Sequence, residues 1–368
     1  MIAQEEAFAR IRLLRSPNIG PVSYRQLLAR FGSAEAAIEA LPDLAQRGGR
    51  AYVAARPEII AEEISQVRRA RAKYLFHDQP GYPRLLAEAA GAPPILTWRG
   101  DLSIAERPCV AIVGARNASA AAVKLARDFS AALSAAGFTV VSGLARGIDG
   151  AAHWGALPAT VGVIASGIDV TYPPEHAELQ ERVAKEGLLL AEQPPGTEPL
   201  ARHFPSRNRI IAGLSLGTVV VEAALRSGAL ISARLAAEAG REVFALPGSL
   251  DNPTARGCHR LIREGAALVE SPGEVVEALE PVARSLAELL RGRLEATPAR
   301  PARRSARGQA PTDGDHNRLW SALGHDPTGM DSLVERTGLT VAELSSMLLL
   351  MELEGRVVAD NGRYARRP

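Results

Sequence analysis

Two stretches in the middle of this sequence read Cys109-Val-Ala-Ile-Val-Gly-Ala-Arg116 and Thr139-Val-Val-Ser-Gly-Leu-Ala-Arg-Gly-Ile-Asp149. Each is an apolar run of strand length that leads into a glycine turn and then into a helical pattern. A turn of this kind aims backbone N–H groups at one spot, and here it also carries an arginine. Both turns therefore suit a phosphate.

The same alternation continues through the central part of the sequence. Strand-length apolar runs alternate with helical patterns, which predicts a doubly wound, mostly parallel sheet with helices on both faces. We therefore expect the α/β class, with an extended Rossmann-like sheet. Ligands of such sheets bind at the carboxyl ends of the strands, where the glycine turns lie. The seven runs are residues 109–113, 139–141, 160–165, 188–191, 218–221, 242–246 and 267–269.

Length and composition exclude several classes of function. The 368 residues can hold an α/β core and smaller attached domains, and a net charge of +2 does not by itself indicate nucleic-acid binding. No apolar run approaches the length of a membrane span, and the first residues lack the basic start of a signal peptide, so we expect a cytoplasmic protein without membrane contact. Two cysteines are too few for a metal cluster, and no lysine follows a glycine-rich turn, which excludes a P-loop.

The N-terminal segment, residues 1–75, has helical periodicity that is interrupted by Pro17-Asn-Ile-Gly-Pro-Val22. Helix, tight turn and helix in this order are similar to a helix-hairpin-helix, whose turn amides can hold a phosphate. A small helical packing domain explains the same pattern. The central domain is expected over residues 76–280. Its first part, up to Gly100, is rich in proline, and we expect this segment to be a connection that packs on the rest of the domain.

The C-terminal quarter of the sequence changes character twice. Residues 281–315 lose apolar content and are typical of a flexible linker, whose arginines could touch nucleic acid or simply be solvated. Residues 316–368 show three helical segments and a hairpin around Asn361-Gly362, which predicts a winged helix. The last of these helices, residues 340–354, carries three glutamates and no lysine or arginine. We therefore expect a contact with protein rather than the reading of a DNA sequence.

The first turn does not fit a dinucleotide. In Gly114-Ala-Arg-Asn-Ala-Ser119, Arg116 stands where a dinucleotide fold needs its second glycine, and its side chain would block the pyrophosphate. The second strand ends in Ser142 rather than in an acid for the ribose. We therefore expect no cofactor. Arg116 can instead bind a backbone phosphate, and we favour this reading over a surface arginine near a helix start because the turn also carries glycine and Ser119.

Two further groups of residues invite a chemical role. Asp149 and His153 are four residues apart and could form an acid–base pair, but helix-dipole and turn hydrogen bonds explain them more simply. Two arginines in Arg207-Asn-Arg209 oppose the dipole of the helix that they begin, and an anionic ligand would remove this conflict. Ion pairs of either arginine with Glu192, Glu198 or Glu222 would remove it as well.

Taken together, these segments resemble the DNA-processing protein A family, which is also called DprA or Smf. The likeness spans roughly residues 75–280, with family-like helical and winged-helix attachments on either side. The motifs that carry it are Gly114-x-Arg116-x-x-Ser119, Ser142-Gly143-x-x-x-Gly147-Ile148-Asp149-x-x-Ala152-His153, Gly167-x-Asp169-x-x-Tyr172-Pro173, the block Phe204 to Ser215, and Glu222-Ala223 with Ser227-Gly228.

The resemblance implies a single-stranded DNA-binding protein of natural transformation. Such a protein protects the incoming strand, helps to load a RecA-type recombinase and works as a homodimer through its central domain, and it is not known as an enzyme. One departure is His259, which stands where the family usually has asparagine. By resemblance, the residues that would contact or shape the DNA site are Arg116, Ser119, Ser142, Gly143, Gly147, Gly167, Arg207, Asn208, Arg209, Ser227 and Gly228. The residues that would support this pocket are Asp149, His153, Asp169, Tyr172, Phe204 and Glu222.

A single strand needs a cationic groove and stacking platforms. Aromatic residues make up only 4% of the chain, so Tyr172 and Phe204 are the main candidates for stacking, and backbone contacts should dominate. The alternative is a hydrolase that acts on a nucleotide, with Glu222 as acid or base. The sequence before Glu222, Gly213-Leu-Ser-Leu-Gly-Thr218, lacks the PGGxGT-type loop that such an enzyme would have.

Overall fold

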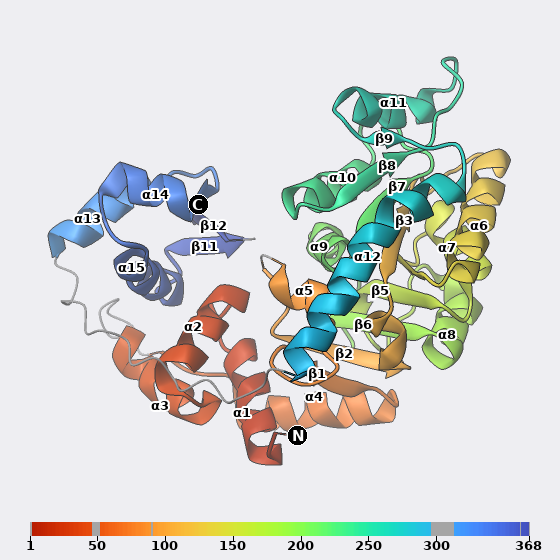
Figure 1. The fold of residues 1–368 in the computed structure, drawn as a ribbon. Coiled ribbons are helices and arrows are strands. Elements are labelled where there is room, and N and C mark those ends of the chain that lie inside the picture. Colours follow the sequence, from red (N-terminus) through yellow and green to blue (C-terminus); the bar gives the residue numbers. More distant parts are fainter. Residues whose placement is uncertain (1, 46–51, 90, 296–312, 361, 368) are drawn as a thin grey trace. The chain divides into compact units, whose positions relative to one another are not determined.

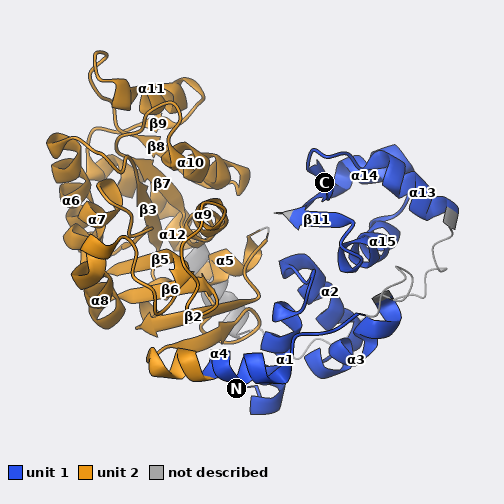
Figure 2. Cartoon of the chain, turned by 180° about the vertical axis from the view of Figure 1, so that it is seen from behind, with its two compact units in different colours: residues 1–64, 299–368 blue, residues 65–298 orange. Residues whose placement is uncertain are grey.

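The computed structural model describes residues 2–45, 52–89, 91–295, 313–360 and 362–367. The chain divides into two compact units (Figure 2). One unit combines residues 1–64 with residues 299–368, and the other is residues 65–298. Within the described ranges, no helix has both the length and the apolar character that crossing a membrane requires.

The larger unit is built on a nine-stranded sheet, in the order β1-β2-β6-β5-β4-β3-β7-β8-β9 (Figure 1). The strands from β3 to β9 are all parallel, which confirms the seven predicted runs and the doubly wound α/β class. These strands are β3 (Cys109–Val113), β4 (Thr139–Ser142), β5 (Thr160–Gly167), β6 (Leu188–Gln193), β7 (Gly217–Val220), β8 (Glu242–Ala245) and β9 (Ala267–Leu268).

Two strands come from the segment that we expected to be only a proline-rich connection. β1 (Lys73–Phe76) and β2 (Ile95–Gly100) extend the sheet beyond β6, and both pair in the antiparallel sense. Gly100 has a positive φ of 108°, and a Cβ there would lie 2.1 Å from the carbonyl oxygen of Gly187. This close approach explains why glycine ends β2. The short runs and flanking prolines hide these strands from a reading of periodicity.

Helices cover both faces of the sheet (Figure 1), and alternate residues of the central strand β3 belong to different apolar clusters. Ala111 and Val113 belong to one apolar cluster, with residues of α5, α9, α10 and α11. Val110 and Ile112 belong to another, with residues of α6, α7 and α12. The helices of this unit are α5 (Arg84–Glu88), α6 (Ala120–Ala135), α7 (Ile148–Ala156), α8 (Ala177–Glu186), α9 (His203–Leu214), α10 (Gly228–Glu238), α11 (Arg256–Arg263) and α12 (Pro272–Glu295).

The direction of winding reverses beside β3. From β3 the chain builds β4, β5 and β6 on one side, and it then crosses to build β7, β8 and β9 on the other. The helices that follow β3 and β7 consequently lie on opposite faces and leave a crevice between the two carboxyl ends. The turn after β3 and the turn after β7 meet there, so topology brings the predicted residues Ser119 and Glu222 together at this edge of the sheet.

The smaller unit joins the two ends of the chain. Its N-terminal part has helical order and its C-terminal part has the three helices and three-stranded sheet of a winged helix, as predicted. Of the expected linker, residues 281–295 lie in the helix α12, and residues 296–312 are outside the described residues. Asn361 of the expected hairpin turn is also outside the described residues. The elements are α1 (Gln4–Arg15), α2 (Pro21–Phe31), α3 (Ala34–Ala45), α4 (Pro57–Arg69, which runs into the larger unit), α13 (Asp313–Ala322), β10 (Thr328–Gly329), α14 (Met330–Thr337), α15 (Val341–Leu353), β11 (Val357–Asp360) and β12 (Arg363–Arg366).

The last helix of the winged helix packs on the N-terminal helices. Leu349 and Leu353 of α15 are buried in one cluster with Leu13, Leu27 and Leu41. In addition, Asn18 in the N-terminal turn donates a hydrogen bond to the carbonyl oxygen of Leu353, over 3.1 Å. The apolar side of α15 therefore belongs to the core of this unit.

Candidate nucleic-acid interface

A cleft of about 240 Å³ opens at the carboxyl edge of the sheet. Three consecutive loops supply its walls, because the carboxyl ends of the neighbouring parallel strands β3, β4 and β5 meet there. Two of its polar residues, Asn117 and Arg146, were not singled out from the sequence, although Arg146 lies within the second glycine turn. The lining residues are Arg116, Asn117, Ala145, Arg146, Tyr172 and Pro173.

Arg116 lies exposed over an aromatic surface. Its guanidinium carbon is 4.7 Å from the centre of the Phe204 ring. Tyr172 meets the same ring edge-on, with 5.8 Å between the ring centres, and remains 40% exposed. Cation and rings together form a surface on which a base can stack while its phosphate meets a positive charge.

Arg207 lies behind this surface. Its guanidinium carbon is 6.0 Å from the Phe204 ring centre on the same helix, yet only 6% of the residue is exposed. Its Nη1 lies 3.9 Å from Oδ2 of Asp149, and among the described residues its Nε has no hydrogen-bond partner. Burial lowers the pKa of Arg207, and the charge of Asp149 opposes this effect. Arg207 therefore supports Phe204 and the β4–α7 loop from within the protein.

Asp149 and two glycines hold the loops in place. Oδ2 of Asp149 accepts hydrogen bonds from the backbone N–H groups of Gly143 and Ala145, over 3.2 and 3.3 Å. Burial raises the pKa of Asp149, while these bonds and the cation of Arg207 favour the charged form. Gly147 has a φ of 71°, and a Cβ there would lie 2.3 Å from the carbonyl oxygen of Ala115. The first two turns are thus locked against each other.

The anion position of a dinucleotide fold is filled by the protein itself. Ser119 caps α6, and its backbone N–H and its hydroxyl both donate to the carboxylate of Glu222, over 3.3 and 2.7 Å. This carboxylate lies at the N-terminus of α6, where a pyrophosphate would otherwise bind. Ser142 is also engaged, because its buried hydroxyl donates to the carbonyl oxygen of Ile112 over 2.6 Å. Both serines and Glu222 therefore tie strand ends together.

His153 is buried and lies in a polar chain rather than in the cleft. The hydroxyl of Thr160 donates to the carbonyl oxygen of Val140 over 2.9 Å, so it accepts from Nδ1 of His153 over 2.8 Å. Burial is the main cause that lowers the pKa of His153, to about 3. The imidazole is neutral near pH 7 and does not form an acid–base pair with Asp149.

The remaining predicted residues lie away from the cleft. Arg209 pairs with Glu192 and also donates to the carbonyl oxygen of Gly91, while the neighbouring Asn208 is buried. Ser227 caps α10 and, with Gly228, lines a different groove. The structure thus brings Arg116, Tyr172 and Phe204 together at the surface, and it separates Arg209 from them.

Asp169 and Gly167 shape the loop after β5. The carboxylate of Asp169 accepts from the N–H of Gly196 over 2.8 Å, and the N–H of Gly167 donates to the carbonyl oxygen of Thr197 over 2.9 Å. These bonds join the end of β5 to the segment after β6. His259, on α11, contacts the carbonyl oxygen of Gly248 through Nε2 over 3.0 Å and lies outside the cleft.

Comparison with known proteins gives one consistent result along the chain. The family model of DNA recombination-mediator protein A matches residues 73–280, that of the DprA-like N-terminal HHH domain matches residues 4–65, and that of the DprA winged helix domain matches residues 301–363. Protein Smf of Synechocystis sp. is 38% identical over 324 residues, which are 80% of each chain. DNA processing protein DprA of Streptococcus pneumoniae is 42% identical over 234 residues, 61% of this chain and 83% of the relative.

Solved structures agree with the sequence relatives. DNA processing protein A from Streptococcus pneumoniae superposes with a TM-score of 0.61 and 35% identity, covering 75% of this chain and 98% of that one. The Helicobacter pylori protein, described as having a unique mode of binding single-stranded DNA, superposes with a TM-score of 0.53 and 28% identity, covering 57% and 96%. Since the model of the central domain alone spans more than half of the residues, the chain belongs to the DNA recombination-mediator protein A family.

Proposed function

We propose that this protein binds single-stranded DNA in the Arg116 cleft during natural transformation. In this proposal it protects the incoming strand in the cytoplasm and helps to load a RecA-type recombinase. The observation that carries the proposal is the exposed guanidinium of Arg116 above the Phe204 ring, with Tyr172 at its edge. The binding of single-stranded DNA by the Helicobacter pylori relative supports it.

Binding should be tolerant of sequence and sensitive to salt. The cleft offers guanidinium groups and ring faces, which recognise phosphates and any base, and these features do not favour one base over another. For single strands the logarithm of affinity falls with the logarithm of salt concentration by about 0.7 for each phosphate contacted. We expect Arg116→Ala to weaken binding of a labelled oligonucleotide by about tenfold. It should also reduce the slope of log affinity against log salt concentration by about 0.7, the value for one phosphate contact.

Fluorescence anisotropy over a range of salt concentrations measures both effects, with single-stranded and duplex oligonucleotides side by side. Arg284→Ala is the matched control, because Arg284 is an exposed arginine of α12 that pairs with Glu280 and does not line the cleft. Unchanged affinity in Arg116→Ala, or an affinity that does not depend on salt, would show that the cleft is not the binding site.

A loading assay tests the recombinase step separately. The protein should accelerate the DNA-dependent ATPase of a RecA-type recombinase on strands coated with single-strand binding protein, and Arg116→Ala should lose this acceleration. If Arg116→Ala loses DNA binding and the wild type still gives no acceleration, DNA binding stands and the loading role is wrong.

The proposal includes a homodimer, which we place at the free edge of the sheet. β9 is the last strand of the sheet, and apolar side chains are exposed around it: Leu268 is 47% exposed and Leu250 is 80% exposed. Both line a hollow of about 510 Å³ together with Ile262. A second copy would cover the open edge that a lone molecule exposes to unwanted pairing.

The hydrolase alternative has less support. A catalytic acid or base needs a carboxylate that can reach substrate, but the carboxylate of Glu222 accepts two bonds from Ser119, and the residue is 5% exposed. Incubation of the protein with nucleoside monophosphates, with Glu222→Ala as control, tests this alternative. Turnover that Glu222→Ala abolishes while DNA binding stays intact would favour the enzyme.

A further inference from the structure

A third and larger hollow lies between α10 and α11, beside the strand β8. It has a volume of about 680 Å³ and shares no lining residue with the Arg116 cleft. We refer to it as the α10–α11 groove. Its floor is aliphatic and includes Leu230 of α10, Val243 of β8 and Leu261 of α11, which are partly buried against the core. The volume is in the range of pockets that bury a ligand.

Positive charge surrounds this floor. Four arginines and two glutamates line the groove. Arg260 is bonded to Glu264 over 2.7 Å, and Arg234 lies 3.8 Å from Glu238 of the same helix. The groove therefore carries more cations than its own carboxylates balance.

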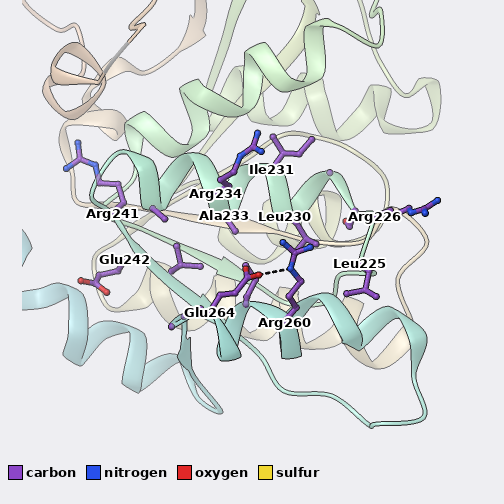
Figure 3. Close-up of a pocket in the computed structure, with 17 residues that line it drawn as sticks. Leu225, Arg226, Leu230, Ile231, Ala233, Arg234, Arg241, Glu242, Arg260 and Glu264 are labelled. Atoms are coloured by element: carbon purple, nitrogen blue, oxygen red, sulfur yellow. Dashed lines mark hydrogen bonds and ion pairs between the residues drawn. The ribbon is translucent and has the colours of Figure 1, made fainter. Parts of the chain in front are cut away.

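The two remaining arginines lie at opposite ends of the groove (Figure 3). Arg226 precedes α10 and Arg241 follows it, and neither makes an ion pair with a carboxylate among the described residues. Arg226 is exposed, whereas Arg241 is half-buried and donates a hydrogen bond to the carbonyl oxygen of Leu85 over 3.4 Å. Burial lowers the pKa of Arg241, and the charge of Glu88 opposes this effect. Between them α10 has 11 residues, which rise about 16 Å, or three helical turns. Glu242, beside Arg241, is the only lining carboxylate at that end, and it is exposed.

We propose that the α10–α11 groove binds an acidic amphipathic helix of a partner protein. An apolar face of about three turns fits the aliphatic floor, with anchors at positions i, i+3 or i+4 and i+7. Carboxylates near both ends of that helix meet Arg226 and Arg241. A nucleic-acid strand fits less well, because no aromatic residue lines the groove and bases would lack a stacking platform. This proposal does not depend on the function proposed for the Arg116 cleft.

Selection from a phage library of random 16-residue peptides tests the proposal on the full chain. Peptides that bind should carry apolar residues at helical spacing and Asp or Glu toward both ends. The double variant Arg226→Glu/Arg241→Glu should weaken the selected peptides at least about tenfold by reversing the charge at both ends. The double variant Arg182→Glu/Arg284→Glu reverses two arginines outside the groove, whose side chains are 42% and 71% exposed, and it should bind the selected peptides unchanged.

A third variant, Ala237→Trp, fills the groove from an exposed position of α10 and should also abolish peptide binding. Thermal unfolding checks that each variant is folded. If no selected peptide depends on Arg226, Arg241 and Ala237, the proposal is wrong. It is equally wrong if the charge reversal weakens single-stranded DNA as strongly as Arg116→Ala does, since the groove would then be a track for nucleic acid.

Discussion

Gly143 is the residue on which the geometry behind the cleft depends. A Cβ at this position would lie 1.3 Å from Nη1 of Arg207, inside the guanidinium group. We expect Gly143→Ala to push Arg207 away from Asp149, to destabilise the protein by about 1–3 kcal/mol and to weaken DNA binding. Gly273→Ala is the control, because Gly273 lies in α12 with only Ser271 Oγ nearby, at 3.7 Å, and alanine favours a helix. Thermal unfolding and anisotropy measure the two effects, and an unaltered Gly143→Ala protein would contradict this account.

Arg146 also acts at the scale of single residues, because it lines the cleft and forms an ion pair with Glu175. A phosphate that binds Arg146 must compete with this carboxylate. We expect Glu175→Gln to raise the affinity for single-stranded DNA severalfold, and Arg146→Ala to lower it. In the Arg146→Ala background, Glu175→Gln should have a much smaller effect. If Glu175→Gln had the same effect in the wild type and in Arg146→Ala, the carboxylate would act by repelling the DNA directly and not by competing for Arg146.

At the scale of elements, the short strand β9 defines one edge of the sheet. Leu268→Glu puts a charge on an exposed residue of this edge and should disrupt a homodimer without disturbing the core, because the side chain is 47% exposed. Light scattering coupled to size exclusion measures the mass. Val123→Glu is the control, because Val123 is an exposed residue of α6 and not of the edge strand β9. This variant should keep the mass of the wild type. A wild-type protein that remains monomeric at all concentrations would rule out the dimer.

The contact between α15 and α2 should depend on pH. Glu352 of α15 is 7% exposed, and burial raises its pKa from 4.5 to about 7. A hydrogen bond with Ser23 lowers the pKa, but by less than burial raises it. The folded protein therefore binds this proton more tightly than the unfolded chain does. The contribution of Glu352 to the free energy of unfolding is therefore largest below pH 4.5, the pKa of this group in the unfolded chain. This contribution falls by about 3 kcal/mol as the pH rises through about 7. Glu352→Gln should raise the melting temperature at about pH 8 and have little effect at about pH 4. Equal effects at both pH values would contradict the assignment.

At the scale of the whole molecule, the two ends of the chain form one unit and the cleft belongs entirely to the other. Removal of residues 310–368 should therefore leave the affinity for single-stranded DNA within about threefold. It should also expose the faces of the N-terminal helices that α15 covers, and so lower their stability. Anisotropy and proteolysis of the N-terminal helices separate the two effects. A large loss of DNA affinity would assign a direct DNA contact to the winged helix.

Local sequence patterns determined the architecture of this protein and the position of its site along the chain. Seven apolar runs, each punctuated by a turn, specified the parallel sheet, because strand length and alternation with helices are local properties. The topology rule then placed the glycine turns at one edge. The antiparallel strands β1 and β2 escaped prediction, since a strand of 4 residues and one of 6 beside prolines owe their order to pairing with partners that are distant in sequence.

Only the tertiary structure decided which of the polar residues face a ligand. Arg207 and Arg209 are neighbours in the sequence, yet one is buried against Asp149 and the other pairs with Glu192. Ser119 and Glu222 looked like parts of a ligand site, but they satisfy each other across the point where the winding reverses. The sequence carries the residue types and their order, whereas burial and partners depend on contacts between segments that lie up to 103 residues apart, as Ser119 and Glu222 do. Such contacts are fixed only when the whole sheet assembles.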